Sequence, residues 1–273
     1  MAWKSLCYAG VLALMISAAA AVMPVWADDG VVLINQAKVI VAGGFPYSIN
    51  TAGSYRLAGN LTVSSPVNAI NVTAAPVTID LNGFTITGSS LVAVGILGSA
   101  GSLTVSGGTI QSFLSGVDVI TTSGAMAVHD LTVLNASVGV SSTAPIRLTN
   151  VSIRGSTQAV LCESDCILLG SSLNSSQFGV ITNGGTIVAV DNLVLAGSFG
   201  FAISGGATGG TAALLDNTVA SSSGGSITGV SVLPLGPPVV VAASRNVFNT
   251  AGGTCLSGSI TSLGDNVCNG TKQ

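Results

Sequence analysis

The sequence predicts an all-β chain that folds as one right-handed parallel β-helix of about ten coils. Three observations support this prediction. A degenerate unit of 20 to 29 residues repeats along the chain. Each unit holds three short apolar runs separated by Gly, Ser and Asn, which corresponds to one coil of three strands. Val, Ile and Thr are abundant, and these β-branched residues together with many glycines disfavour helices.

The repeat is located by two sets of turn residues. The second apolar run of each unit opens at Asn60, Gly83, Gly107, Asp130, Asn150, Gly170, Asn192, Asn217, Asn246 and Asn266. The third run follows markers at Gly95, Gly116, Gly139, Ala159, Gly179, Gly200 and Gly253. Asn and Gly both tolerate left-handed backbone geometry, and stacked Asn amides can form a hydrogen-bonded ladder along the axis. A leucine-rich repeat would need regular leucines and a helical back, which this sequence lacks.

The first 27 residues have the features of a signal peptide. Lys4 precedes an apolar run from Leu6 to Met23, and Val25-Trp26-Ala27 then provides a cleavage site. The mature chain is expected to begin at Asp28 and to be secreted or periplasmic. An uncleaved membrane anchor is the alternative, because the run is almost long enough to span a bilayer. No later segment is expected to cross a membrane.

Residues 28–58 are predicted to form an N-terminal cap, and residues 59–273 the parallel β-helix. An open coil end is a free sheet edge, so both ends require covering. The segment Asp29–Val41 has the composition of a short amphipathic element, and Gly43-Gly44-Phe45-Pro46 would end it.

Four cysteines remain after removal of the signal peptide: Cys162, Cys166, Cys255 and Cys268. An even number in an exported chain favours disulfides, and a bond between Cys255 and Cys268 would fasten the last two coils. A metal site at Cys162 and Cys166 is less favoured, because zinc needs four converging ligands and the chain has one histidine.

The composition excludes several classes of protein. Hydrophobic residues make up 48% of the chain and charged residues 6%, so the chain is not intrinsically disordered. Removal of Lys4 leaves six Lys and Arg against ten Asp and Glu, a formal charge of about −4. Such a chain has no basic patch for nucleic acid.

Several stretches resemble the bacterial exported β-helix proteins of the pectin-lyase-like superfamily. They are Gly44-Phe45-Pro46-Tyr47-Ser48-Ile49, Gly53-Ser54-Tyr55-Arg56-Leu57-Ala58-Gly59-Asn60-Leu61, Val77-Thr78-Ile79-Asp80-Leu81-Asn82-Gly83-Phe84 and the ending Gly264–Gly270. The resemblance covers essentially the whole mature chain and implies the β-helix fold. Members include polysaccharide lyases, hydrolases and binding proteins, so it does not imply one activity.

The catalytic patterns of these enzymes are missing. The polygalacturonase pattern would need a Gly-His pair and Arg-x-Lys, but His129 follows Val128 and no Arg-x-Lys occurs. His129 and Asp130 are expected to point to opposite faces of a strand, which would prevent them from cooperating. Asp80 and Asp118 have no evident partner. No catalytic residue is therefore predicted.

Two further groups of charges are candidates for ligand binding. Arg147 and Arg154 flank one turn and are able to meet a uronate carboxylate, although solubilising roles are favoured. The residues before the last four turn asparagines form a column of Asp191, Asp216, Arg245 and Asp265. Asp191 and Asp216 are the candidate calcium ligands, against the alternative of an exposed ion ladder.

Two classes of function remain. The favoured one is an exported, non-catalytic β-helix that binds a polysaccharide or a component of the cell envelope. The alternative is a carbohydrate-active enzyme, of lyase or hydrolase type, with a divergent site. Aromatic platforms for sugars would support binding, but the phenylalanines of the later coils are mostly expected in the core. These are Phe113, Phe178, Phe199, Phe201 and Phe248.

Overall fold

The computed structural model describes residues 30–207, 209–234 and 237–272. The chain divides into the units Met1–Val31 and Val32–Gln273, and the second is described here. The predicted signal peptide, residues 1–27, lies outside the described residues. Within the part of the chain that is described, no helix has the length and apolar character needed to cross a membrane.

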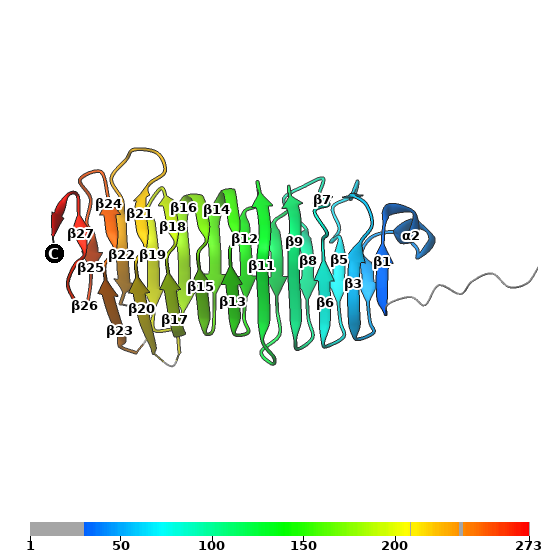
Figure 1. The fold of residues 1–273 in the computed structure, drawn as a ribbon, viewed down its shortest axis with the longest axis horizontal. Coiled ribbons are helices and arrows are strands. Elements are labelled where there is room, and N and C mark those ends of the chain that lie inside the picture. The colour runs from blue at the N-terminus through cyan, green and yellow to red at the C-terminus, as the bar shows by residue number, and fades with distance from the viewer. Residues whose placement is uncertain (1–29, 208, 235–236, 273) are drawn as a thin grey trace, which may run out of the picture. The chain divides into compact units, whose positions relative to one another are not determined.

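The second unit is a parallel β-helix of about ten coils, as the repeat predicts. Its strands lie in three walls, here called A, B and C, and each strand pairs in parallel with its equivalent in the next coil (Figure 1). Some strands bend from one wall into the next. The order along the chain is A, B, C, A, so successive walls enclose the interior.

The bounds of the strands are as follows. Wall A contains β1 (Val31–Ile34), β3 (Gly53–Leu57), β6 (Val77–Asp80), β13 (Ile146–Thr149), β15 (Cys166–Leu169), β17 (Gly185–Val190), β20 (Gly210–Leu215), β23 (Val239–Ser244) and β26 (Ile260–Ser262). Wall B contains β4 (Leu61–Thr62), β7 (Thr85–Thr87), β18 (Leu193–Ala196), β21 (Thr218–Ser221), β24 (Val247–Asn249) and β27 (Val267–Cys268), with β28 (Thr271–Lys272) antiparallel to β27. Wall C contains β2 (Tyr47–Ile49), β5 (Ile70–Val72), β8 (Val94–Gly98), β10 (Ser115–Val119), β12 (Val138–Ser142), β19 (Phe199–Ser204), β22 (Thr228–Leu233) and β25 (Leu256–Ser257). Strands β9 (Leu103–Gln111) and β11 (Met126–Leu134) bend from wall A into wall B, and β14 (Ser152–Cys162) and β16 (Ser172–Asn183) bend from wall B into wall C.

The interior is a continuous apolar core. Alternate residues of each strand point inward, and equivalent residues stack from coil to coil. In wall C the fully buried Val140, Val160, Val180 and Phe201 follow one another in this way. Burial of such columns, and not helix propensity or charge, holds the coils together.

The corner between walls A and B contains two neighbouring columns of residues. The outer column has left-handed backbone geometry at Asp130, Asn150, Asp191, Asp216, Arg245 and Asp265, with Gly107 and Gly170 in the same column. The inner column holds the buried Asn192, Asn217, Asn246 and Asn266. The predicted set of turn residues mixed these two columns, because its last four markers lie one residue later in the coil than Gly107, Asp130, Asn150 and Gly170. Left-handed geometry therefore belongs to the preceding residue in the last four coils.

The predicted asparagine ladder is present in the inner column. The Asn192 Nδ2 donates to Asn217 Oδ1 at 2.8 Å, and Asn217 Nδ2 donates to Asn246 Oδ1 at 3.0 Å. Each Oδ1 also accepts the backbone N–H of the preceding asparagine, as Asn246 Oδ1 does from Asn217 N at 2.9 Å. Ser171 continues the ladder, since its N–H donates to Asn192 Oδ1. These buried amides have their hydrogen bonds satisfied.

The corner that leads into wall C is built on small residues. Gly95, Gly116, Gly139, Ala159, Gly179, Gly200 and Gly229 occupy equivalent positions. A Cβ at Gly139 would lie 2.5 Å from the Ala159 carbonyl oxygen, and one at Gly200 would lie 2.6 Å from that of Gly229. The predicted marker Gly253 is not in this column, where the last coil has Cys255.

A short helix lies at the N-terminal end of the β-helix. At the N-terminal end, α2 (Gln36–Val41) is capped by Asn35, whose side chain accepts from Lys38 N at 2.9 Å. Gln36 covers the edge of wall B, because its amide accepts from Thr62 N and donates to Thr62 O. Strands β2 and β3, within the segment predicted as the cap, already pair in parallel with β5 and β6.

Candidate functional site

The outer face of wall C carries a pair of aromatic rings. Phe178 and Phe199 occupy equivalent positions in adjacent coils and are half-buried. Their ring centroids are 5.5 Å apart and the ring planes differ by 5°. Each precedes a glycine of the corner column, so the side chain points away from the core. The other late phenylalanines, Phe113, Phe201 and Phe248, are in the core as predicted.

The two rings are parallel and stacked on one another, with centroids 5.5 Å apart. Both are half-buried, so together they present an apolar surface of two adjacent coils against which the C–H groups of a sugar can pack. We call Phe178 and Phe199 the aromatic platform.

The surroundings of the platform are apolar with a few polar groups. Gln158 precedes Phe178 in the same column, and the half-buried Leu161 and Ile181 follow three residues later in the same two strands. An apolar surface with a small number of polar groups is typical of binding sites for small organic ligands.

Two carboxylates lie farther along the same face. Asp118 is half-buried in β10, and the negative charge of Glu163 reaches it from two coils away. Burial raises the pKa of Asp118 and Glu163 raises it further, although the Ser141 hydroxyl and the Val119 N–H lower it. The prediction that Asp118 has no partner was therefore wrong, because stacked coils bring together residues far apart in sequence.

The cysteines form the two predicted pairs. Cys162 is joined to Cys166 and Cys255 to Cys268, with Cα separations of 6.2 and 5.8 Å that suit disulfides. The first pair encloses the short loop that holds Glu163. The second links the last two coils, as expected for a C-terminal fastening.

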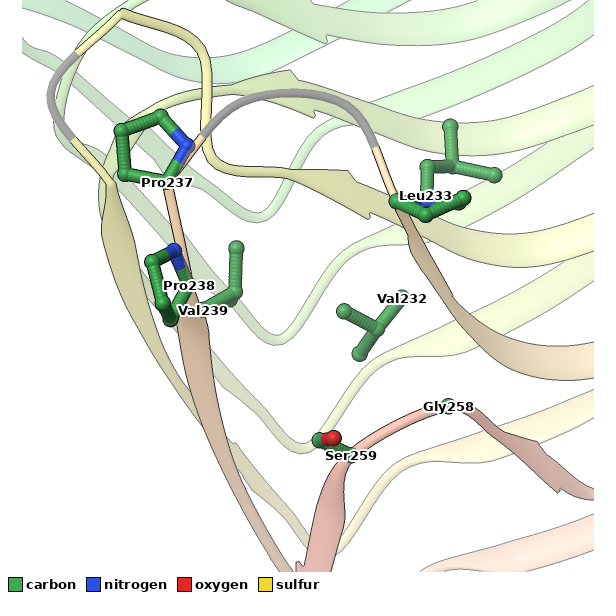
Figure 2. A pocket seen from close by; sticks show the side chains of 8 residues that line it. Val232, Leu233, Pro237, Pro238, Val239, Gly258 and Ser259 are labelled. Atoms are coloured by element: carbon green, nitrogen blue, oxygen red, sulfur yellow. The ribbon is translucent and has the colours of Figure 1, made fainter.

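Two hollows in the described surface are lined mainly by uncharged residues. Figure 2 shows one of about 250 Å³ beside Leu233, Pro237 and Val239. Its described lining residues are uncharged. A second, of about 220 Å³, is lined by apolar residues together with Arg147 and Asp165.

The candidate calcium ligands Asp191 and Asp216 are adjacent in the outer corner column, as predicted. Arg245 donates to both carboxylate oxygens of Asp216, at 2.7 and 2.6 Å, and this contact lowers the pKa of Asp216. Asp265 pairs with Lys272. Among the described residues, no group of three or more acidic, His or Cys side chains is arranged to hold a metal ion.

His129 and Asp130 are in contact, contrary to the prediction. His129 Nδ1 lies 2.9 Å from Asp130 Oδ2. The prediction assumed a continuing strand, but Asp130 has φ +53 at the A–B corner, which turns its side chain back toward the preceding residue.

Asp80 also has a partner, because Arg56 Nε donates to it at 2.9 Å. Arg147 and Arg154 are exposed on walls A and B.

The aromatic platform was not predicted from the sequence, because its outward orientation depends on the column of small residues at the corner that leads into wall C. Residues immediately before that column point outward, and the Phe-Gly pairs at 178–179 and 199–200 are separated by one repeat. This spacing was the available signal.

Comparison with known proteins gives support at the level of the fold. No family model and no curated protein sequence matches the chain. A similar solved structure is the enzymatically active domain of tailspike protein 2 from bacteriophage CBA120, with a TM-score of 0.58 and 15% sequence identity. The likeness covers 81% of this chain and 45% of that one, so this chain spans about half its length. At this identity it shows a shared β-helix fold.

Proposed function

We propose that the protein is an exported β-helix that binds glycan, without cleaving it, through the aromatic platform on wall C. The observation that carries the proposal is the half-buried, stacked pair Phe178 and Phe199, which lies outside the core in adjacent coils. Outward phenylalanines cost solubility without adding to the core, so a binding role accounts for them.

The scarcity of charge on this face favours a weakly charged glycan. Beside the platform the outer residues are Gln158, Leu161 and Ile181. Stacking on the rings would supply most of the binding free energy, and the Gln158 amide would supply a hydrogen bond.

The test is binding of the purified protein to an array of bacterial polysaccharides, followed by affinity measurements on the polysaccharides that bind. Phe178→Ala and Phe199→Ala are each expected to weaken binding about tenfold, since loss of one stacking contact costs about 1.4 kcal/mol. Leu193→Ala is the matched control, because this side chain is a large apolar residue exposed on wall B. Equal affinities for all three variants and the wild type would contradict the proposal.

Asp118 favours one alternative, cleavage of the glycan. A half-buried carboxyl with a raised pKa is suited to act as a general acid, and Glu163 on the same face would be the base. In this case the purified protein would release reducing sugars from a bound polysaccharide, and Asp118→Asn would abolish the release without weakening binding.

A further inference from the structure

A row of polar side chains follows the outer edge of wall A beside the A–B corner. Arg56, Asp80, Ser106, His129 and Thr149 occupy equivalent positions in five successive coils. Neighbouring members are separated by one strand spacing, about 4.8 Å. His129 therefore has a hydroxyl on each side, Ser106 in the preceding coil and Thr149 in the next.

His129 is held by a chain of two hydrogen bonds. Its Nδ1 lies 2.9 Å from Asp130 Oδ2, and Asp130 Oδ1 accepts from Asn150 Nδ2 at 2.6 Å. His129 and Asn150 together lower the pKa of Asp130, so its carboxylate is ionised and only accepts. Nδ1 must then donate in this contact, which leaves Nε2 as the ring nitrogen available to a neighbouring hydroxyl.

Ser106 occupies the position equivalent to His129 in the preceding coil. Within the described residues its hydroxyl forms no hydrogen bond, and the serine is half-buried beside the histidine. Gly107 follows it at the corner with φ +72, and the Asp80 carboxylate lies close by, 3.0 Å from where a Cβ on Gly107 would be. Thr149 has an additional methyl group on the hydroxyl-bearing carbon and is the more hindered nucleophile.

We propose that Ser106, His129 and Asp130 form a hydrolytic triad that cleaves carboxylic esters with short acyl groups. Ser106 and His129 are the catalytic residues, and Asp130 and Asn150 are positioning residues. This part of the polar row is open to solvent, since 44% of the His129 side chain and 57% of the Asp130 side chain are exposed. It offers no apolar channel for a long acyl chain. The proposal does not depend on glycan binding at wall C.

The reaction balances with water as the only co-reactant. Ser106 Oγ attacks the ester carbonyl carbon while His129 Nε2 takes the hydroxyl proton. The C–O bond to the alcohol then breaks, and the imidazolium returns the proton to the leaving oxygen, which leaves an acyl-serine. Water next attacks this ester with His129 as base. The products are the alcohol, a carboxylic acid and free Ser106.

The test uses p-nitrophenyl acetate for turnover and a fluorophosphonate for covalent labelling of the purified protein. We expect one equivalent of label, found on Ser106 by peptide mass spectrometry, and ester turnover that Ser106→Ala reduces at least 100-fold. His129→Gln should cause a similar loss. Asp130→Asn should slow both reactions, whereas Asp130→Glu should restore part of the rate because it keeps a carboxylate.

Thr149→Val is the matched control, since it removes the other hydroxyl beside His129. Each variant is also checked for an unchanged Tm, so that loss of activity is separated from loss of folding. Absence of labelling in the wild-type protein would overturn the proposal. So would labelling and turnover that persist in Ser106→Ala or are lost in Thr149→Val.

Discussion

Asparagine and aspartate have different roles at adjacent positions of the A–B corner. The outer residue adopts left-handed geometry and remains exposed, as Asp216 does, whereas the next residue, Asn217, is buried in the ladder. Asp and Asn accept left-handed geometry at low cost. An amide has both the donor and the acceptor that a continuous ladder needs.

The ladder makes Asn217 a sensitive position. Asn217→Ala is expected to destabilise the protein by about 3 kcal/mol or more, because groups of Asn192 and Asn246 would be left buried without partners. Urea unfolding measures the change in free energy. Asn249→Ala is the control, since this asparagine is exposed on wall B, and it should change stability by less than about 0.5 kcal/mol.

Asp118 predicts a dependence of stability on pH. Burial raises its pKa in the folded state above the ordinary value. Below that ordinary value the carboxyl is protonated in both states, so it costs no stability; above the raised value the folded protein must hold a partly buried charge. Asp118→Asn should therefore raise the Tm at pH 7 and leave it unchanged near pH 3. An equal increase at both values would show that the charge is not the cause.

Calcium binding at Asp191 and Asp216 is testable by titration calorimetry. Arg245 occupies both oxygens of Asp216, and calcium requires six or more oxygen ligands, so we expect no heat at millimolar calcium. Heat that disappears in Asp191→Ala and in Asp216→Ala would instead establish the site. Arg245→Ala, which frees Asp216, provides a second variant in which to look for weak binding.

At the scale of the element, the column of small residues at the corner that leads into wall C allows each strand to pack closely against the next coil. Gly139→Ala is expected to cost about 2 kcal/mol or more, because its Cβ would lie 2.5 Å from both the Ala159 carbonyl oxygen and Ile153 Cγ2. Thermal unfolding compares it with Gly101→Ala, where the nearest atom is 3.5 Å away and almost no loss is expected. Similar Tm values for the two variants would show that the corner readily widens.

The repeat made the elements predictable but not the exact columns. Three apolar runs in each unit predicted three walls, and the residue spacing predicted parallel stacking. The one-residue error at Asn192, Asn217, Asn246 and Asn266 arose because each asparagine directly follows another polar residue, and Asn is itself suited to a left-handed corner position. His129 and Asp130 were misjudged for the same reason, since a left-handed residue ends the alternation of a strand. The aromatic platform depends on the bend at Gly179 and Gly200, which spacing alone does not reveal.

At the scale of the whole molecule, export is the property to measure first. The predicted signal peptide and its site at Val25-Trp26-Ala27 imply a mature chain that begins at Asp28. Mass spectrometry of the protein from the periplasm or medium should give this terminus. Recovery of intact Met1 from the membrane fraction would support the anchor instead.

The asparagine ladder also determines how such a protein can change length over evolution. Ladder neighbours are separated by 20, 25 or 29 residues, yet they meet with the same hydrogen bonds. Loops elsewhere in the coil absorb the difference. A single-residue insertion at the A–B corner would displace an amide from its partner, whereas duplication of an entire coil would reproduce both partners at once. Gene duplication in whole repeats is therefore the route by which this β-helix can lengthen or shorten without loss of its internal order.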